Sequence, residues 1–287
     1  MGAVVGIDLG TTNTVVAAAR EGRPTAIPDE SGSTLIPSIV SFLPSGAVLV
    51  GSAARERRSV DPRNTVYSIK RLIGRTWGTE EINEAVARFP FELREGPGRA
   101  TFVVARGETY TLPEISAFVL RKAKSIAELE LGEAVDRAVI TVPASFNDLQ
   151  RAATKVAGRV AGLEILRVLN EPTAAAVAFG HASGNRECIA VYDFGGGTFD
   201  FTLLRLTDDV FEVLATGGNT YLGGDDIDSA IVRQISGRLP GGPRLDPKTD
   251  AETFERLRGA AEQLKIDLSI SSDARIRLAD YELTEAT

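Results

Sequence analysis

The sequence predicts an α/β protein built around a duplicated β-hairpin. Strand-like and helix-like segments alternate along its 287 residues, which is typical of the α/β class. Two distant segments, residues 6–13 and 192–198, also share one pattern. Each has an apolar strand, an aspartate, an apolar residue, a glycine and a turn of small, hydroxyl-rich residues, and another strand follows. Two such hairpins so far apart in the chain indicate a repeated structural unit.

Local patterns predict the elements of the first two-thirds of the chain. A helix should start at Thr111, where threonine caps, Pro113 suits the first turn and Glu114 completes a capping box, and it should end at Gly132. A second helix should open at Asn147 and close near residue 162. The other expected elements are buried strands at 4–9 and 189–194, strands at 14–19, 138–142 and 166–169, an alanine-rich helix that ends at 180, and short strands with turns over 20–111.

The pattern changes after residue 217. Glycine-rich turns precede an expected helix around 227–235, and a proline-containing loop is expected over 240–247. Thr249 and Glu252 should open a long helix whose apolar residues recur in three-then-four steps and form one face. The predicted domains are a first lobe at 1–184, which contains an inserted subdomain at about 38–111, and a second lobe at 185–287.

Composition narrows the classes of function. The net charge of −7 argues against nucleic acid or an anionic membrane as the main partner, because both are bound through excess lysine and arginine. The chain has one cysteine, Cys188, and one histidine, His181, which disfavours an internal disulfide, a Ser-His-Asp triad and a multi-histidine metal site. We expect Cys188 to be a core residue. Because no signal peptide, myristoylation motif or membrane-spanning run is visible, we expect a cytoplasmic protein.

The paired turns are suited to phosphate binding. A glycine- and threonine-containing turn after a buried strand exposes backbone N–H groups, and two facing turns could hold a polyphosphate from both sides. Asp8 and Asp193 at the strand ends would repel phosphate, so we expect a Mg²⁺ ion to mediate through its waters. Neither turn is a Walker A loop, because no Gly-Lys-Ser/Thr follows and each turn leads to a strand. Each alone could be a plain hairpin turn, but the pair with matched aspartates favours phosphate binding.

Further segments complete a pattern that resembles the 70-kDa heat-shock chaperones. The two hairpin turns are similar to the first and second phosphate motifs of that family. The other matching segments are the strand at 139–144, the connecting motif at 170–176, the segment with the catalytic lysine at 64–75, and the adenosine-clasping helix with Glu262, Lys265 and Ser269. The resemblance runs from residue 3 to about 270 and is to the nucleotide-binding domain, of the bacterial DnaK type.

This resemblance implies the actin-like (ribonuclease-H-like) two-lobed ATPase fold, with ATP/ADP and Mg²⁺ as cofactors. Asp8 and Asp193 would organise Mg²⁺ through its water shell. The residues implied in catalysis are Lys70, Glu171, Asp193, Thr198 and Asp200, and those implied in nucleotide binding are Gly10, Thr11, Thr12, Asn13, Gly195, Gly196, Gly197, Thr198, Gly224, Glu262, Lys265 and Ser269. Without the resemblance, Lys70 would be assigned to the solvated surface, as would the polar face of the last helix.

The sequence departs from the family pattern at several positions. Ser145 stands where the family usually has tyrosine, and Phe194 where it has leucine. The family's later glycine motif, which forms the other wall of the adenosine pocket, is absent, as are the interdomain linker and the peptide-binding domain. We therefore expect a C-terminally incomplete domain that binds nucleotide poorly by itself. The strand at 189–192, apolar on both sides, would then lack part of its cover.

The expected function is an ATP-binding, ATP-hydrolysing module of a heat-shock chaperone that acts in protein folding and the stress response. In the full-length protein it would control client binding through its nucleotide. The implied partners are a J-domain co-chaperone, which would dock near Arg167, Asn170 and Thr173, a nucleotide exchange factor, and unfolded clients held by a further domain. Two alternatives stay open: a sugar or small-molecule kinase of the same fold, and a truncated, non-hydrolysing module that binds a co-chaperone.

Overall fold

A computed structural model describes residues 2–180, 187–207, 210–238, 246–278 and 281–286. Below, residues 2–180 are called the N-terminal region and residues 187–286 the C-terminal region. The predicted lobe boundary between 184 and 185 lies outside the described residues, as does His181, and the division into lobes stays a prediction. Within the described part of the chain, none of the helices combines the length and the hydrophobicity needed to cross a membrane.

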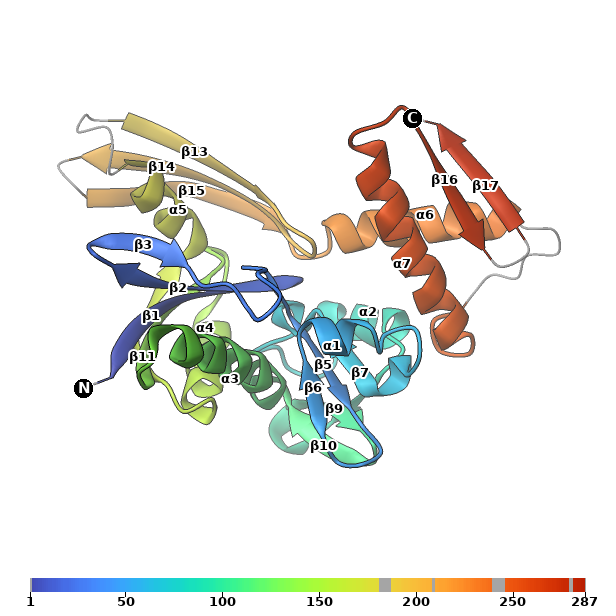
Figure 1. The fold of residues 1–287 in the computed structure, drawn as a ribbon, viewed down its shortest axis with the longest axis horizontal. Coiled ribbons are helices and arrows are strands. Elements are labelled where there is room, and N and C mark those ends of the chain that lie inside the picture. The colour runs from blue at the N-terminus through green and yellow to red at the C-terminus, as the bar shows by residue number, and fades with distance from the viewer. Residues whose placement is uncertain (1, 181–186, 208–209, 239–245, 279–280, 287) are drawn as a thin grey trace.

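The N-terminal region is organised around a mixed β-sheet (Figure 1). Its strands are β1 (Ala3–Leu9), β2 (Asn13–Arg20), β3 (Arg23–Ala26), β4 (Ile36–Pro37), β11 (Val135–Val142) and β12 (Glu164–Asn170). Their order is β12-β11-β1-β2-β3, and β4 pairs with β2. Strands β1, β11 and β12 run parallel, whereas β2 returns antiparallel to β1. The carboxyl ends of the parallel strands therefore meet at one edge, where Asp8 lies opposite Thr141 in the register.

Three helices accompany this sheet: α3 (Leu112–Leu131), α4 (Asp148–Val160) and α5 (Glu171–Gly180). The capping boxes predicted at Thr111 and Asn147 are both formed, and Gly132 ends α3 in the left-handed conformation. Helices α3 and α4 pack against each other and against the sheet. Helix α5 contacts β12 on one side and β13 on the other, so it lies between the two regions (Figure 1).

Two small sheets and two short helices form the rest of the N-terminal region. Their bounds are β5 (Ile39–Phe42), β6 (Val48–Val50), β7 (Thr65–Tyr67), β8 (Glu92–Glu95), β9 (Thr101–Ala105), β10 (Glu108–Thr111), α1 (Ser52–Arg55) and α2 (Glu80–Arg88). The sequence analysis expected only short strands here and missed α2. No side chain caps α2 at Thr79, so the local start signal was lacking, although Ile82 and Ala85 are fully buried.

The C-terminal region consists of an antiparallel three-stranded sheet, a separate helix pair and a two-stranded sheet (Figure 1). Its elements are β13 (Glu187–Phe194), β14 (Phe199–Thr207), β15 (Val210–Asn219), α6 (Gly224–Arg238), α7 (Ala251–Leu268), β16 (Asp273–Leu278) and β17 (Tyr281–Ala286). Helices α6 and α7 share a small core that includes Val232, Leu257 and Leu264. The predicted long helix is present as α7, but its N-cap is Asp250 and not Thr249, and Asp250 makes no side-chain cap bond.

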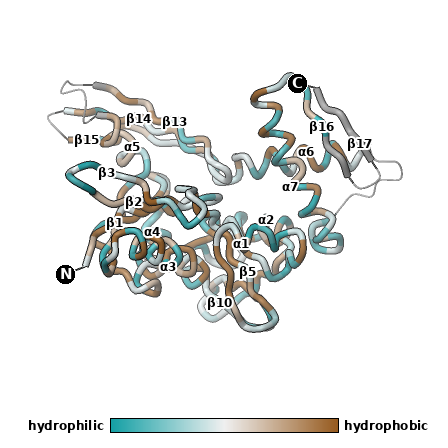
Figure 2. Tube along the Cα trace, in the orientation of Figure 1, coloured by the Kyte–Doolittle hydropathy of each residue, from teal (hydrophilic) through white to brown (hydrophobic). Residues whose placement is uncertain are grey.

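Burial corrects two further predictions. Cys188 is exposed and is not a core residue. Strand β13 is present but is not buried as predicted: Tyr192 is 68% exposed and Phe194 is 42% exposed, which agrees with the expectation that this strand lacks part of its cover. Figure 2 shows hydrophobic stretches on β13 and β14 at the outside of the molecule. In β1, by contrast, the buried residues alternate with exposed ones, so this strand is buried on one face only.

Buried polar contacts join the two regions. Glu255 of α7 is 2% exposed and accepts hydrogen bonds from Arg58 Nε at 3.0 Å and from the Tyr67 hydroxyl at 2.5 Å. Burial alone would raise the pKa of Glu255, but the charges of Arg58 and Arg258 outweigh it and hold that pKa below its ordinary value. The ionised Glu255 carboxylate therefore links α7 to the N-terminal region through Arg58 and Tyr67.

Candidate nucleotide site

The two hairpin turns meet in one pocket, which is called the phosphate pocket below after its predicted ligand. Its lining includes, from the first turn, Gly10, Thr11, Thr12 and Asn13, and, from the second turn, Gly195, Gly196 and Thr198. The two turns approach each other so closely that only glycine fits at positions 196 and 197. A Cβ atom on Gly196 would lie 1.9 Å from Thr12 Oγ1, and one on Gly197 would lie 2.2 Å from Thr11 Cγ2. The structure thus brings together two segments that the sequence places far apart.

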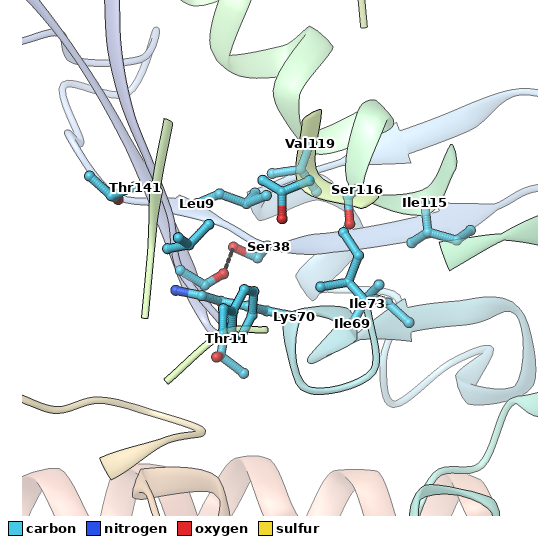
Figure 3. A pocket seen from close by; sticks show the side chains of 14 residues that line it. Leu9, Thr11, Ser38, Ile69, Lys70, Ile73, Ile115, Ser116, Val119 and Thr141 are labelled. Atoms are coloured by element: carbon cyan, nitrogen blue, oxygen red, sulfur yellow. Dashed lines mark hydrogen bonds between the residues drawn. The ribbon is translucent and has the colours of Figure 1, made fainter. Parts of the chain in front are cut away.

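Each turn is held from behind by hydrogen bonds. Behind the first turn, the Ser38 hydroxyl donates to the Gly10 carbonyl at 2.9 Å (Figure 3). Behind the second, the Gly195 carbonyl accepts from the Gly224 amide at 3.1 Å, and the Gly196 carbonyl accepts from the Asp225 amide at 2.7 Å. The start of α6 therefore fixes the second turn. Among the described residues, the buried Thr12 Oγ1 has no hydrogen-bond partner, so a phosphate oxygen can supply the one that it lacks.

A buried ion pair lies beside the turns. Lys70 Nζ donates to Glu171 Oε1 at 2.5 Å, and only 8% and 13% of the two side chains are exposed. Figure 3 shows Lys70 close to Thr11. Burial alone would lower the pKa of Lys70, but the carboxylates of Glu171, Asp8 and Asp193 outweigh it and raise that pKa. The lysine is therefore protonated, and it supplies a fixed positive charge.

The carboxylates around Lys70 differ in their surroundings. Burial raises the pKa of Glu171 and that of Asp193; Lys70 opposes both shifts and Asp8 adds to them. Asp8 accepts a hydrogen bond from Thr141 Oγ1 at 2.7 Å, a partner that the sequence analysis did not identify. The sequence did contain a signal for this contact. Thr141 lies near the end of the strand predicted at 138–142, which pairs in parallel with β1 and places Thr141 opposite Asp8.

Asp200 does not line the pocket. Its side chain is buried, and its Oδ1 accepts a hydrogen bond from the Ser145 hydroxyl at 3.1 Å. Burial raises the pKa of Asp200, against the effect of this hydrogen bond. The sequence analysis noted Ser145 as a departure from the family pattern, but it did not predict that the shorter side chain would contact Asp200.

The residues predicted to clasp adenosine lie outside the phosphate pocket. Lys265 Nζ contacts the Asp228 carboxylate at 2.7 Å and the Gly224 carbonyl at 3.1 Å. Glu262 pairs with Arg55 at 2.8 Å, and Ser269 donates to the carbonyl of residue 265 at the end of α7. These side chains form internal contacts that connect α7 to α6 and to the N-terminal region. Their predicted contact with adenosine stays a prediction.

The pocket suits a divalent cation together with phosphate. Its lining carries three carboxylates, on Asp8, Glu171 and Asp193, but one cation, Lys70. An unaccompanied polyphosphate would meet net negative charge there. Asp8 and Asp193 are the donors that could hold Mg²⁺, with waters and phosphate oxygens as its other ligands. A bound Mg²⁺ would neutralise phosphate charge.

Paired hairpins on sheets that meet at one acid-lined pocket are typical of the actin-like, two-lobed ATPase fold. The family model described as Hsp70 protein matches residues 4–286. The chain therefore belongs to the Hsp70 family, and this confirms both the predicted family and the predicted fold class. Hsp70 proteins are in general ATP-binding, ATP-hydrolysing chaperones, so the chain corresponds to a chaperone ATPase module.

Proposed function

We propose that this chain binds ATP with Mg²⁺ and hydrolyses it to ADP, and that its nucleotide state controls client binding in the full-length chaperone. The observation that carries the proposal is the Lys70–Glu171 ion pair, buried in a pocket that both glycine turns line. Phosphoryl transfer depends mainly on positioning and on neutralised charge. A fixed ammonium group between two sets of backbone donors supplies both.

The side chains have distinct roles in this proposal. Lys70 Nζ holds a terminal phosphate oxygen and orients the attacking water. Thr198 and the glycine amides hold phosphate oxygens, while Asp8 and Asp193 hold the cation. Glu171 can accept the proton of the water, because its raised pKa makes it a stronger base than an ordinary glutamate. Asp200, two residues after Thr198 and hydrogen-bonded to Ser145, would position the second turn.

The proposed partner proteins are inferred from the family, and the docking site of one of them is inferred from the surface formed by Arg167, Asn170 and Thr173. Hsp70 proteins generally work with J-domain proteins, exchange factors and clients. Arg167, Asn170 and Thr173 lie on β12 and at the start of α5, close to the ion-paired Glu171. Arg151 Nη2 donates to Asn170 Oδ1 at 2.8 Å, which fixes this surface to α4. A J-domain bound here would contact the helix that carries Glu171. The bacterial DnaK type and a cytoplasmic location stay predictions.

Two measurements test the proposed activity. Calorimetry with ATP should show binding, weak as the sequence analysis expects, that is lost when EDTA removes Mg²⁺, and single-turnover assays should show conversion of bound ATP to ADP. Binding without conversion would contradict hydrolysis by this chain. A sugar or other small molecule that accelerates ATP loss and is itself phosphorylated would replace the proposal with the kinase alternative.

A further inference from the structure

A second cavity lies between the two regions and shares no lining residue with the phosphate pocket. Its volume is about 240 Å³. The N-terminal region contributes residues of α2 and of the segment around Tyr67, and the C-terminal region contributes α6 and α7. Its apolar lining residues include Phe89 and Phe254. A molecule in this cavity would touch both regions at once.

The polar lining of this cavity is strongly basic. Two aspartates, Asp225 and Asp226, face five arginines: Arg58, Arg71, Arg88, Arg233 and Arg258. The whole chain has a net charge of −7, so this concentration of arginine is a local exception. Where this positive charge is not balanced by neighbouring acids, it favours an anion in the partly enclosed volume.

The existing ion pairs balance four of these five arginines. Asp226 pairs with both Arg71 and Arg88, and Glu84 also pairs with Arg88. Glu255 pairs with both Arg58 and Arg258, and Asp225 and Asp228 lie within 3.9 Å of Arg258. Arg233, which is exposed, has no ion pair or hydrogen bond among the described residues.

Arg58 has one buried nitrogen that lacks a hydrogen-bond partner among the described residues. Its side chain is 10% exposed, and its Nε bonds to Glu255, but its Nη2 is buried without a hydrogen-bond partner among the described residues. A buried guanidinium nitrogen without an acceptor is unfavourable, and an oxygen from a ligand in the cavity would remove that cost.

We propose that this cavity binds a small organic anion whose charged group pairs with Arg58 and Arg233 and whose apolar body packs against Phe89 and Phe254. Guanidinium groups suit phosphate and carboxylate equally in geometry, and the aromatic rings favour a flat or aliphatic body. Such a ligand would hold α2 and α7 together and so stabilise the arrangement in which the two regions are joined. The inference does not depend on the proposed ATP hydrolysis.

Calorimetry with phenyl phosphate as the probe tests this site. We expect a dissociation constant of about 1 mM or tighter. Phenol, which lacks the charge, and inorganic phosphate, which lacks the apolar body, should each bind at least about tenfold more weakly. Phosphate that binds as tightly as phenyl phosphate would overturn the role of the apolar wall. No detectable heat at about 10 mM phenyl phosphate would overturn the proposal.

Variants decide whether the probe occupies this cavity. Arg233→Met and Arg58→Met should each weaken phenyl phosphate binding at least about tenfold. Arg94→Met is the matched control, because Arg94 is exposed, pairs with Glu92 and lines neither pocket. Arg233 is exposed, so its replacement leaves the fold intact even if Arg58→Met does not fold. Binding that survives Arg233→Met but is lost in Lys70→Ala would place the probe at the hairpin turns and overturn the proposal.

Discussion

The two hairpins carry nearly the same motif but are packed very differently. In β1, Val5, Ile7 and Leu9 are buried in a sheet with helices packed against it. In β13, Tyr192 and Phe194 are substantially exposed, and the sheet has three strands. The turns nevertheless meet in one pocket. The comparison shows that the motif determines the turn, whereas burial depends on what packs against the strands.

The matched aspartates also differ. Asp8 accepts a hydrogen bond from Thr141, whereas the described residues provide none for the Asp193 carboxylate. Burial raises the pKa of Asp193, and Asp8 raises it further against the opposing charge of Lys70. The positive charge of Lys70 therefore offsets the negative charges of both aspartates, one from each hairpin. The largest predicted effect follows from removing it.

We predict that Lys70→Ala slows single-turnover ATP hydrolysis on the order of 10²- to 10³-fold. The change removes the fixed positive charge between the two turns and leaves Glu171 buried without its partner. Lys122→Ala is the control, because Lys122 is on α3 and outside the phosphate pocket. If Lys70→Ala retains the wild-type rate, the two turns do not act as one site around this lysine.

We predict that Glu255→Gln lowers the free energy of unfolding by about 3 kcal/mol, because it leaves Arg58 buried without a counter-charge and leaves Arg258 with only its longer pairs to Asp225 and Asp228. Thermal unfolding followed by circular dichroism would measure it. Glu252→Gln, at an exposed position on the same helix, should change little. A single transition that shifts as a whole means that the two regions unfold together. A wild-type midpoint in Glu255→Gln would show that this contact does not couple them.

We predict that Gly197→Ala weakens ATP binding about tenfold, which corresponds to about 1.4 kcal/mol. The added methyl group would overlap Thr11 and approach Arg71 Nε to 2.9 Å, so the turns must separate. Gly217→Ala is the matched control, because a Cβ atom at that β15 position meets open space. Equal affinities of the two variants for ATP, measured by calorimetry, would mean that close contact between the turns is not needed.

The sequence predicted most reliably what neighbouring residues determine. The capping boxes at Thr111 and Asn147 join residues three apart, and both are formed. The hairpin turns were predicted in the same way, because each is determined by a few adjacent residues. The short helix α2 was missed because it lacks such a cap.

Contacts between distant residues could not be predicted in the same way. Arg58 and Glu255 are 197 positions apart, and Ser145 and Asp200 are 55 apart. The topology that brings them together is set by the sheets, and no local pattern encodes the pairing. The exposure of Cys188 has the same origin, because an apolar run shows that a strand forms but not what covers it.

The smallest predicted effect concerns Asp200, which ties the second hairpin to the N-terminal region through Ser145. Burial raises the pKa of Asp200 in the folded protein, so folding favours its protonated form. This contribution to stability is fully present below the pKa of the unfolded chain, about 4, and is lost as the pH rises through the folded value. Near pH 7 the buried carboxylate therefore destabilises the fold.

Asp200→Asn should accordingly raise the free energy of unfolding near pH 7, and the gain over wild type should vanish below about pH 4. The asparagine carbonyl can still accept the hydrogen bond from Ser145, so the change removes the charge and keeps the contact. Urea denaturation across this pH range measures the difference, with Glu133→Gln at an exposed position as the control. A loss of stability near pH 7 would mean that the surroundings favour the ionised form. The second hairpin would then be held by charge, as Glu255 holds α7.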